Sequence, residues 1–231
     1  MEFWNLPNME IMKPTVPFPP PKNPKFTFID LFAGIGGFRI AMQRCGGECV
    51  FSSEWDEKAQ TTYRANFGDT PFGDITKEET VNAIPKTFDI LCGGFPCQPF
   101  SSIGKRQGFE HPTQGTLFFH IQQILGRHRP RAFILENFPG LITHKEGQTL
   151  QTIKDVLRDE LHYTMDYMVL NSADFGVPQY RKRLYLIGFR EDLPVYVDGE
   201  DSSNGNQISP DGRTRDGNFV FSFPKGKFCK D

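Results

Sequence analysis

Short apolar runs alternate with amphipathic stretches along the first 190 residues, and this rhythm predicts strands linked by helices. Strands are expected where β-branched and aromatic residues cluster, and helices where apolar residues recur every three to four positions. The expected strands are 26–31, 49–53, 88–92, 132–135, 165–170 and 183–189, and the expected helices are 37–45, 57–67, 115–127 and 149–161. This alternation predicts an α/β fold, with a mainly parallel, twisted sheet covered by helices on both faces. The last two strands are expected to pair near a sheet edge.

The two ends of the chain differ in composition from its middle. Prolines crowd the first 24 residues and prevent regular helix or sheet, so residues 1–25 are expected to form an extended N-terminal arm. Residues 191–231 include a stretch rich in Asp, Ser, Asn and Gly that has little to bury, and we expect a linker there. The folded domain is therefore placed at residues 26–190.

Composition narrows the class of protein. The chain has 231 residues, a formal net charge of −2, 38% hydrophobic and 23% charged residues, which excludes a wholly disordered or fibrous protein. No apolar run approaches the roughly 18 residues of a membrane helix, and the start is too rich in proline for a signal peptide. We therefore expect an intracellular protein with no membrane partner, whose binding to any nucleic acid would depend on local basic patches.

The five cysteines are too few and too scattered for a disulfide framework. Cys45, Cys49, Cys92 and Cys97 do not have the spacing of a zinc knuckle, so no metal is expected. The first three are expected to be thiols of the core.

A glycine-rich turn follows the first strand, in the sequence Asp30-Leu-Phe-Ala-Gly34-Ile-Gly36-Gly37. Ligands of parallel α/β folds bind at this end of the strands. Arg39 stands where the dinucleotide fingerprint needs its third glycine, so the turn does not favour a pyrophosphate. Glu54 follows about 20 residues later, where a carboxylate can bind both hydroxyls of a ribose.

Two further residues suggest an adenosine without phosphates. Trp55 offers a flat face for adenine, and Asp74 can accept a hydrogen bond from the exocyclic amine. Alone, Glu54 is better explained as a helix-start charge, Trp55 as core and Asp74 as a turn residue. Together at the strand ends they favour S-adenosylmethionine, with Phe32 as a further candidate contact.

The strongest single candidate for chemistry is Cys97, in the loop Gly93-Gly-Phe-Pro-Cys-Gln-Pro-Phe-Ser101. Prolines on both sides restrict the backbone and would hold the thiol outward. A nearby positive charge would be needed to favour the reactive thiolate at neutral pH. An average cysteine is more often a buried, inert thiol, and the loop setting is what favours a nucleophile here.

These segments resemble the DNA (cytosine-5)-methyltransferases, in particular the bacterial enzymes of restriction-modification systems, from about residue 26 to residue 190. The resemblance rests on short motifs in the family's order: Asp-Leu-Phe-Ala-Gly-Ile-Gly-Gly (30–37), Glu54-Trp55, Gly73-Asp-Ile75, Gly-Gly-Phe-Pro-Cys-Gln (93–98), Gly115-Thr-Leu-Phe, Glu136-Asn137 and Gln179-Tyr-Arg-Lys-Arg183. It implies a Rossmann-like fold that uses S-adenosylmethionine and releases S-adenosylhomocysteine. The implied cofactor contacts are Asp30, Phe32, Ala33, Gly34, Gly36, Gly37, Glu54, Trp55, Asp74, Ile75, Pro96 and Leu117.

The same resemblance implies the roles of the catalytic residues. Cys97 would add to C6 of a cytosine extruded from duplex DNA, which makes C5 nucleophilic toward the methyl group. Glu136 would serve N3 and the 4-amino group, and Arg183 would hold O2, with Arg181 nearby. Asn137 would orient the cysteine loop. For Glu136 and the two arginines, the alternative is a surface ion network.

Residues 101–111 resemble the mobile loop of this family that closes on DNA, although an ordinary surface loop is the alternative. The implied DNA contacts are Gln98, Ser101, Gly104, Lys105 and Arg106. Family members usually continue into a target-recognition region. Residues 26–190 are thus expected to be the catalytic and cofactor-binding domain, and residues 191–231 a linker or the truncated start of that region. A second polypeptide, or a longer parent protein, is expected to supply the rest.

Two other functions stay open, a tRNA cytosine-5 methyltransferase and a non-catalytic subunit that binds cofactor or DNA. The favoured function implies double-stranded DNA as partner and a location in the bacterial cytoplasm, with the nucleoid.

Overall fold

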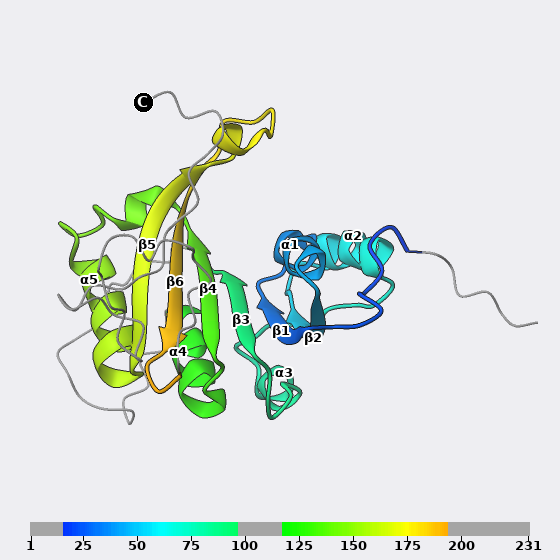
Figure 1. Cartoon of the computed structure of the whole chain (residues 1–231), viewed down its shortest axis with the longest axis horizontal. Coiled ribbons are helices and arrows are strands. Elements are labelled where there is room, and N and C mark those ends of the chain that lie inside the picture. The colour runs from blue at the N-terminus through cyan, green and yellow to red at the C-terminus, as the bar shows by residue number, and fades with distance from the viewer. Residues whose placement is uncertain (1–15, 97–116, 194–231) are drawn as a thin grey trace, which may run out of the picture.

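The computed structural model describes residues 16–96 and 117–193 of the chain (Figure 1). The order of elements is β1 (Phe26–Leu31), α1 (Gly37–Arg44), β2 (Gly47–Ser53), α2 (Glu57–Phe67), α3 (Glu78–Asn82), β3 (Ile90–Gly94), α4 (Leu117–His128), β4 (Ala132–Asn137), the 3-10 turn η1 (Pro139–Leu141), α5 (Gln148–Asp155), the π-helical turn η2 (Val156–Glu160), β5 (Tyr163–Asn171), the 3-10 turn η3 (Ser172–Phe175) and β6 (Lys182–Arg190).

All these strands belong to one sheet, in the order β2-β1-β3-β4-β6-β5. The first four in sequence run parallel, whereas β6 is antiparallel to β4 and β5 is antiparallel to β6. The predicted mainly parallel sheet is confirmed, and so is the pairing of the last two strands near an edge. β5 and β6 extend beyond their neighbours, with η3 at the tip (Figure 1).

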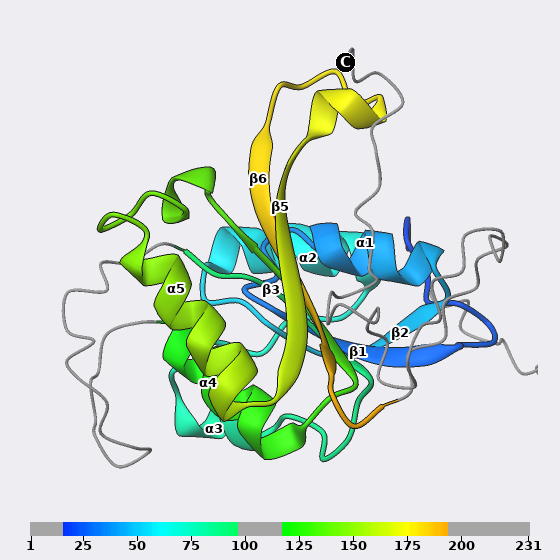
Figure 2. The same cartoon turned by 60° about the vertical axis from the view of Figure 1, so that its left-hand side comes forward.

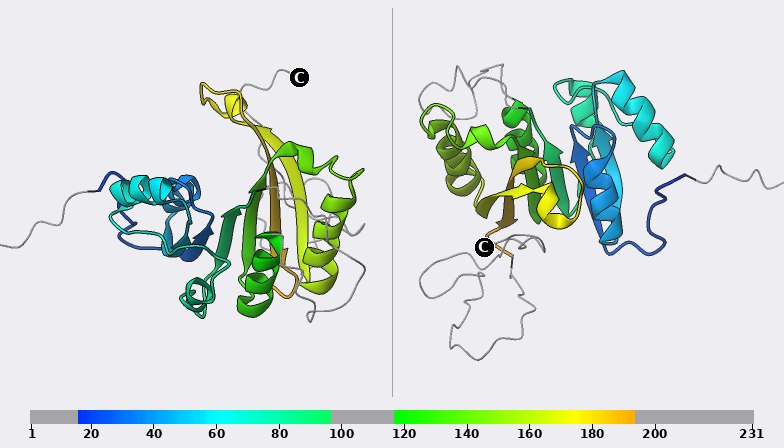
Figure 3. Two further views of the ribbon diagram at one scale, coloured as in Figure 1. Left: turned by 180° about the vertical axis from the view of Figure 1, so that it is seen from behind. Right: turned by 90° about the horizontal axis from the view of Figure 1, so that it is seen from above.

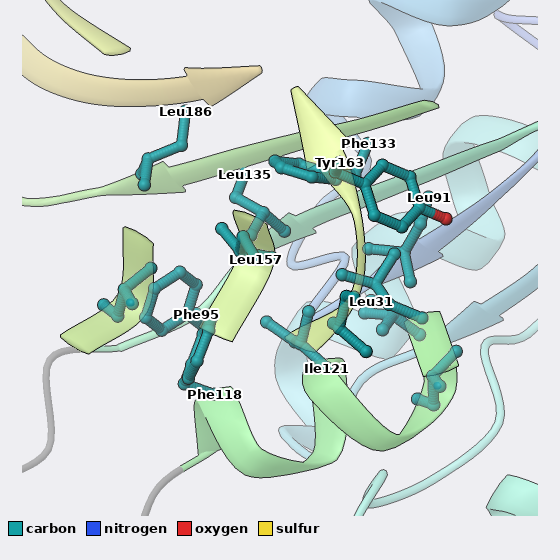
Figure 4. Close-up of a cluster of buried hydrophobic side chains, with 14 of the residues drawn as sticks. Leu31, Leu91, Phe95, Phe118, Ile121, Phe133, Leu135, Leu157, Tyr163 and Leu186 are labelled. Carbon is teal, nitrogen blue, oxygen red and sulfur yellow. The ribbon is translucent and has the colours of Figure 1, made fainter. Parts of the chain in front are cut away.

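Alternation of side chains along β1 divides the interior into two layers. Ile29 and Leu31 face α4 and α5 in the main core, which Phe95 and Phe133 also help to fill (Figure 4). Phe28 points the other way and packs in a smaller cluster with Met42 of α1. Figures 2 and 3 show α1 and α2 on one face of the sheet and α4 and α5 on the other, which confirms the predicted helices on both faces.

The helices differ from the prediction in two places. α3 was not predicted, because only Thr80 of its five residues is buried and no apolar stripe marks it. The expected helix 149–161 is α5 followed by the π-helical turn η2, where the Leu161 amide bonds the Val156 carbonyl five residues back. The predicted N-cap of α2 is confirmed, since the Asp56 side chain accepts from the Ala59 amide at 2.8 Å.

The three described cysteines occupy different environments. Cys92 is buried in β3 and Cys49 is half-buried, but Cys45 is exposed at the end of α1. The prediction of a core thiol is therefore wrong for Cys45, because the turn that leads into β2 leaves this position at the surface. In residues 16–96 and 117–193, no helix is long and apolar enough to cross a membrane.

Candidate active site

The glycine-rich turn between β1 and α1 is wound tightly and has open space beside it. Phe32, Gly34 and Gly36 have φ of 56°, 56° and 96°, in the left-handed region. A positive φ raises the conformational energy of an aromatic residue such as Phe32. Residues with backbone strain of this kind are concentrated at functional sites. A Cβ added at Gly34 or at Gly37 would meet no atom within 4 Å, so the turn leaves room for a ligand close to its backbone.

Glu54 fixes this turn from the end of β2. Its Oε2 accepts the Gly34 amide at 2.8 Å, and its Oε1 accepts the amides of Trp55 and Asp56, both at 2.9 Å. The side chain is buried. Oε1 accepts two amides, whereas Oε2 accepts only one and can accept a further hydrogen bond. The sequence predicted Glu54 as a ligand-binding carboxylate, and the structure adds that it orders the glycine turn.

Trp55 and the segment around Asp74 lie beside Glu54. Trp55 is 74% exposed, so its ring face is free of core contacts. The Glu54 amide donates to the Phe72 carbonyl at 2.8 Å, which brings residues 72–75 next to the end of β2. Asp74 is half-buried and its Oδ1 accepts the Thr76 amide, while Ile75 is buried. The predicted adenosine contacts thus share one edge of the sheet.

Asp30 has a different environment from the other candidate cofactor contacts. Its side chain is 0% exposed on the α1 side of β1, and neither carboxylate oxygen has a hydrogen-bond partner in the described structure. Burial raises the pKa of Asp30 to about 7, against the opposing charge of the Arg39 guanidinium. The structure therefore does not place Asp30 with the open residues of the turn.

An ion pair between β4 and β6 lies at the same end of the sheet, where the parallel strands terminate. Arg183 Nε lies 2.6 Å from Glu136 Oε1. Glu136 is opposite Tyr185 in the antiparallel register, so Arg183, two residues away on the same face, reaches it diagonally. Burial raises the pKa of the Glu136 carboxyl, while the charges of Arg183 and Arg181 lower it.

Two features near this pair were not predicted. Gly94 is the β3 neighbour of Glu136, and a Cβ there would come within 3.2 Å of Glu136 Oε2. Asn171 holds the start of β6, because its Oδ1 accepts the Arg181 amide at 3.0 Å. The second glycine of the Gly93-Gly94 pair was a possible signal for the first feature, and nothing in the sequence marked the second.

Asn137 links the ion pair to the start of the cysteine loop. Its side chain is buried, and its Nδ2 donates to the Phe95 carbonyl at 2.9 Å. Phe95 in turn packs against Phe118, with ring centroids 5.8 Å apart. Phe95 and Phe118, which flank residues 97–116 in the sequence, therefore lie side by side.

Two further candidates, Pro96 and Leu117, border residues 97–116. Pro96 is exposed and Leu117 half-buried, at the two ends of the same segment. Among the residues described, no cluster of three or more His, Cys, Asp or Glu side chains could hold a metal ion. The predicted residues that lie outside the described ranges are Cys97, Gln98, Ser101, Gly104, Lys105 and Arg106.

Comparison with known proteins identifies relatives of this chain. Type II methyltransferase M.HpaII of Haemophilus parainfluenzae is 60% identical over 183 residues, covering 77% of this chain and 51% of that protein. M.HhaI of Haemophilus parahaemolyticus is 49% identical, over 73% of this chain and 50% of that protein. The chain thus spans about half the length of these relatives. The crystal structure of Spodoptera frugiperda DNMT2 shares the fold at 24% identity, with a TM-score of 0.58 over 76% of this chain and 53% of that one.

The model of one protein family matches residues 26–218, which include the glycine turn, Glu54, the cysteine loop and the Glu136–Arg183 pair. On this match and these identities, the chain belongs to the family of C-5 cytosine-specific DNA methylases.

Proposed function

We propose that this chain carries the catalytic and cofactor-binding residues of an enzyme that methylates C5 of cytosine in duplex DNA, as the modification enzyme of a bacterial restriction-modification system. The observation that carries the proposal is the Glu136–Arg183 pair beside Gly94 and the anchored Phe95, since only Pro96 separates Phe95 from Cys97 in sequence. Residues 26–190 form the catalytic domain in this proposal, and residues 191–231 lead toward a target-recognition region. A DNA substrate would place the enzyme at the nucleoid.

The residues of the glycine turn fit S-adenosylmethionine. Glu54 would bind the ribose hydroxyls, exposed Trp55 would stack on adenine and Asp74 would accept from its amine. The open space at Gly34 and Gly37 suits the close approach of the methionine part. The bound cofactor supplies an electrophilic methyl group. The product would be S-adenosylhomocysteine.

The proposed reaction begins with a cytosine turned out of the duplex. The Cys97 thiolate forms a bond to C6, and the ring electrons move toward C5 and N3. Glu136 holds a proton at N3, and burial, which raises the pKa of its carboxyl, favours that role. Arg183 and Arg181 supply positive charge near O2 and the thiolate.

C5 then takes the methyl group. Loss of the C5 proton to a base and departure of the Cys97 sulfur restore the aromatic ring, which leaves 5-methylcytosine and regenerates the thiolate. Every bond formed to the enzyme is broken again, and no oxidant or reductant is needed.

The proposal is tested with duplex DNA that contains 5-fluorocytosine. Fluorine at C5 cannot leave as the proton does, so the Cys97–C6 bond should persist as a covalent conjugate. The chain is assayed alone, fused to the C-terminal half of the Haemophilus parainfluenzae relative, and mixed with that half as a separate polypeptide. We expect a conjugate that requires S-adenosylmethionine and is lost in Cys97→Ser.

Each other outcome contradicts part of the proposal. A conjugate that survives in Cys97→Ser would remove that residue from the reaction. Conjugation to tRNA and not to duplex DNA would indicate an RNA methyltransferase. Cofactor binding without any conjugate, in all three formats, would indicate a non-catalytic subunit.

A further inference from the structure

The N-terminal arm contacts the glycine turn through the end of α2. We propose that Phe18 is a positioning residue for the cofactor site, holding the turn 33–37 in its binding conformation through Asn66 and Phe67. This inference rests on the proposed use of S-adenosylmethionine. It also changes the expected domain bounds, because residues 16–25 would then belong to the catalytic and cofactor-binding domain and not to a separate arm.

Hydrogen bonds form the first connection. The Phe18 amide donates to the Asn66 carbonyl at 3.1 Å, and the Asn66 side chain donates through Nδ2 to the Ile35 carbonyl at 3.0 Å. One residue of α2 thus binds the arm with its backbone and the glycine turn with its side chain. Gln43 of α1 secures the arm further, because its Nε2 donates to the carbonyls of Phe18 at 3.2 Å and Pro19 at 2.9 Å.

Aromatic packing forms the second connection. The rings of Phe18 and Phe67 have centroids 5.9 Å apart. The Phe67 ring also lies directly against Gly36, where an added Cβ would be 2.1 Å from Phe67 Cε2. Phe67 forms a small cluster with Ala33 and Tyr63 that is separate from the main core, and Phe18 packs against that cluster. The arm therefore supports the turn indirectly, through the Phe67 ring.

The physical consequence follows from the conformation of the turn. Gly34 and Gly36 are held at positive φ, and glycine has more alternative conformations to lose than any other residue. If the packing beneath Gly36 loosens, the binding conformation of the turn becomes less populated. The apparent dissociation constant then rises by the inverse of that population. The chemical step, in which Phe18 has no part, should keep its rate at saturating cofactor.

The test compares Phe18→Ala with Phe18→Leu and with Val169→Ala, using the full chain. Val169 is half-buried against the main core on β5, so its truncation controls for a general loss of stability. We expect Phe18→Ala to raise the dissociation constant of S-adenosylmethionine about tenfold, measured by calorimetry, and Phe18→Leu to raise it less. Val169→Ala should lower the melting temperature and leave the dissociation constant unchanged.

A second measurement needs no ligand. Hydrogen–deuterium exchange over residues 33–40 should accelerate in Phe18→Ala and not in Val169→Ala. Wild-type affinity and exchange in Phe18→Ala, or an equal loss of affinity in Val169→Ala, would overturn the inference. Failure of the wild-type chain to bind the cofactor would instead contradict the proposed function, while exchange would still show whether the arm holds the turn.

Discussion

Arg183 Nε and Glu136 Oε1 lie 2.6 Å apart, joined diagonally across the antiparallel strands β4 and β6. The pair holds the carboxyl group that we assign to cytosine N3. Glu136→Gln keeps the shape of the side chain and removes its ability to give or take a proton. We expect methyl transfer by the fusion protein to fall at least about 100-fold in single turnover, with cofactor affinity unchanged.

The matched control for Glu136→Gln is Asp192→Asn. Asp192 forms an ion pair of the same length with Arg190, but its side chain is largely exposed and the pair lies near the start of β4, at the opposite end of that strand from Glu136. Asp192→Asn should leave the rate of methyl transfer unchanged. A Glu136→Gln rate within twofold of wild type would contradict the assigned role.

Gly94 should be needed for the position of the Glu136 carboxylate. A methyl group there would come within 3.2 Å of Glu136 Oε2, so Gly94→Ala should displace the carboxylate and slow transfer about tenfold or more. Gly93→Ala is the control, because its Cβ would make only ordinary contacts, at 3.6 Å. Comparable rates for the two variants, measured in the same transfer assay, would show that the carboxylate tolerates the crowding.

Glu54 should determine cofactor affinity through the turn that it orders. In Glu54→Gln, one carboxylate oxygen becomes an amide donor that faces backbone N–H groups. An unmet buried hydrogen bond costs about 1–3 kcal/mol, so affinity for S-adenosylmethionine should fall roughly tenfold to 100-fold in calorimetry. Asp56→Asn, which keeps the N-cap of α2, should bind normally. Unchanged affinity for S-adenosylmethionine in Glu54→Gln would contradict the role assigned to Glu54.

Asp30 should make stability depend on pH. Its folded pKa of about 7 lies above the ordinary value of 3.8, so the folded state holds the proton more tightly than the unfolded state does. The contribution of Asp30 to the free energy of unfolding is therefore fully present below about pH 3.8. It is lost as the pH rises through the folded pKa of about 7. Asp30→Asn, which is neutral throughout, should therefore unfold at a higher temperature than wild type at pH 8, with the difference shrinking toward pH 5. A pH-independent difference in circular dichroism melts would contradict this environment for Asp30.

Most of the fold can be predicted from the sequence, since buried strands need apolar, β-branched residues. β1 has the bounds expected from its apolar run, and α2 begins at the residue after the expected cap. α3 could not be predicted because five residues with one buried side chain leave no periodic pattern. The π-helical turn η2 was missed because Leu157 and Leu161 are spaced as in an ordinary helix.

Candidate site residues could be predicted where the proposed chemistry needs a particular side chain. They could not be predicted where the site needs a residue without a side chain, or where the fold buries the side chain. Glu54 and Glu136 are carboxylates at the ends of β2 and β4, and their positions in the motifs made them candidates. Gly94 of β3 leaves room for the Glu136 carboxylate because it lacks a side chain, and its place in the Gly93-Gly94 pair was only a weak signal of this. The burial of the Asp30 side chain on the α1 side of β1 could not be predicted from its place in the glycine motif, and its contact with the cofactor stays a prediction.

The direction of β6 decides where the polypeptide leaves the sheet. Phe189, near the end of β6, is opposite Ala132, the first residue of β4. The chain therefore leaves the sheet at the end where the parallel strands begin. Arg190 is five residues beyond Tyr185, the partner of Glu136, so the rise of an extended strand puts it about 17 Å away along the sheet. A fluorophore attached just after Arg190 would therefore lie at the end of the sheet opposite the Glu136–Arg183 pair, where it would not occupy the proposed cytosine site.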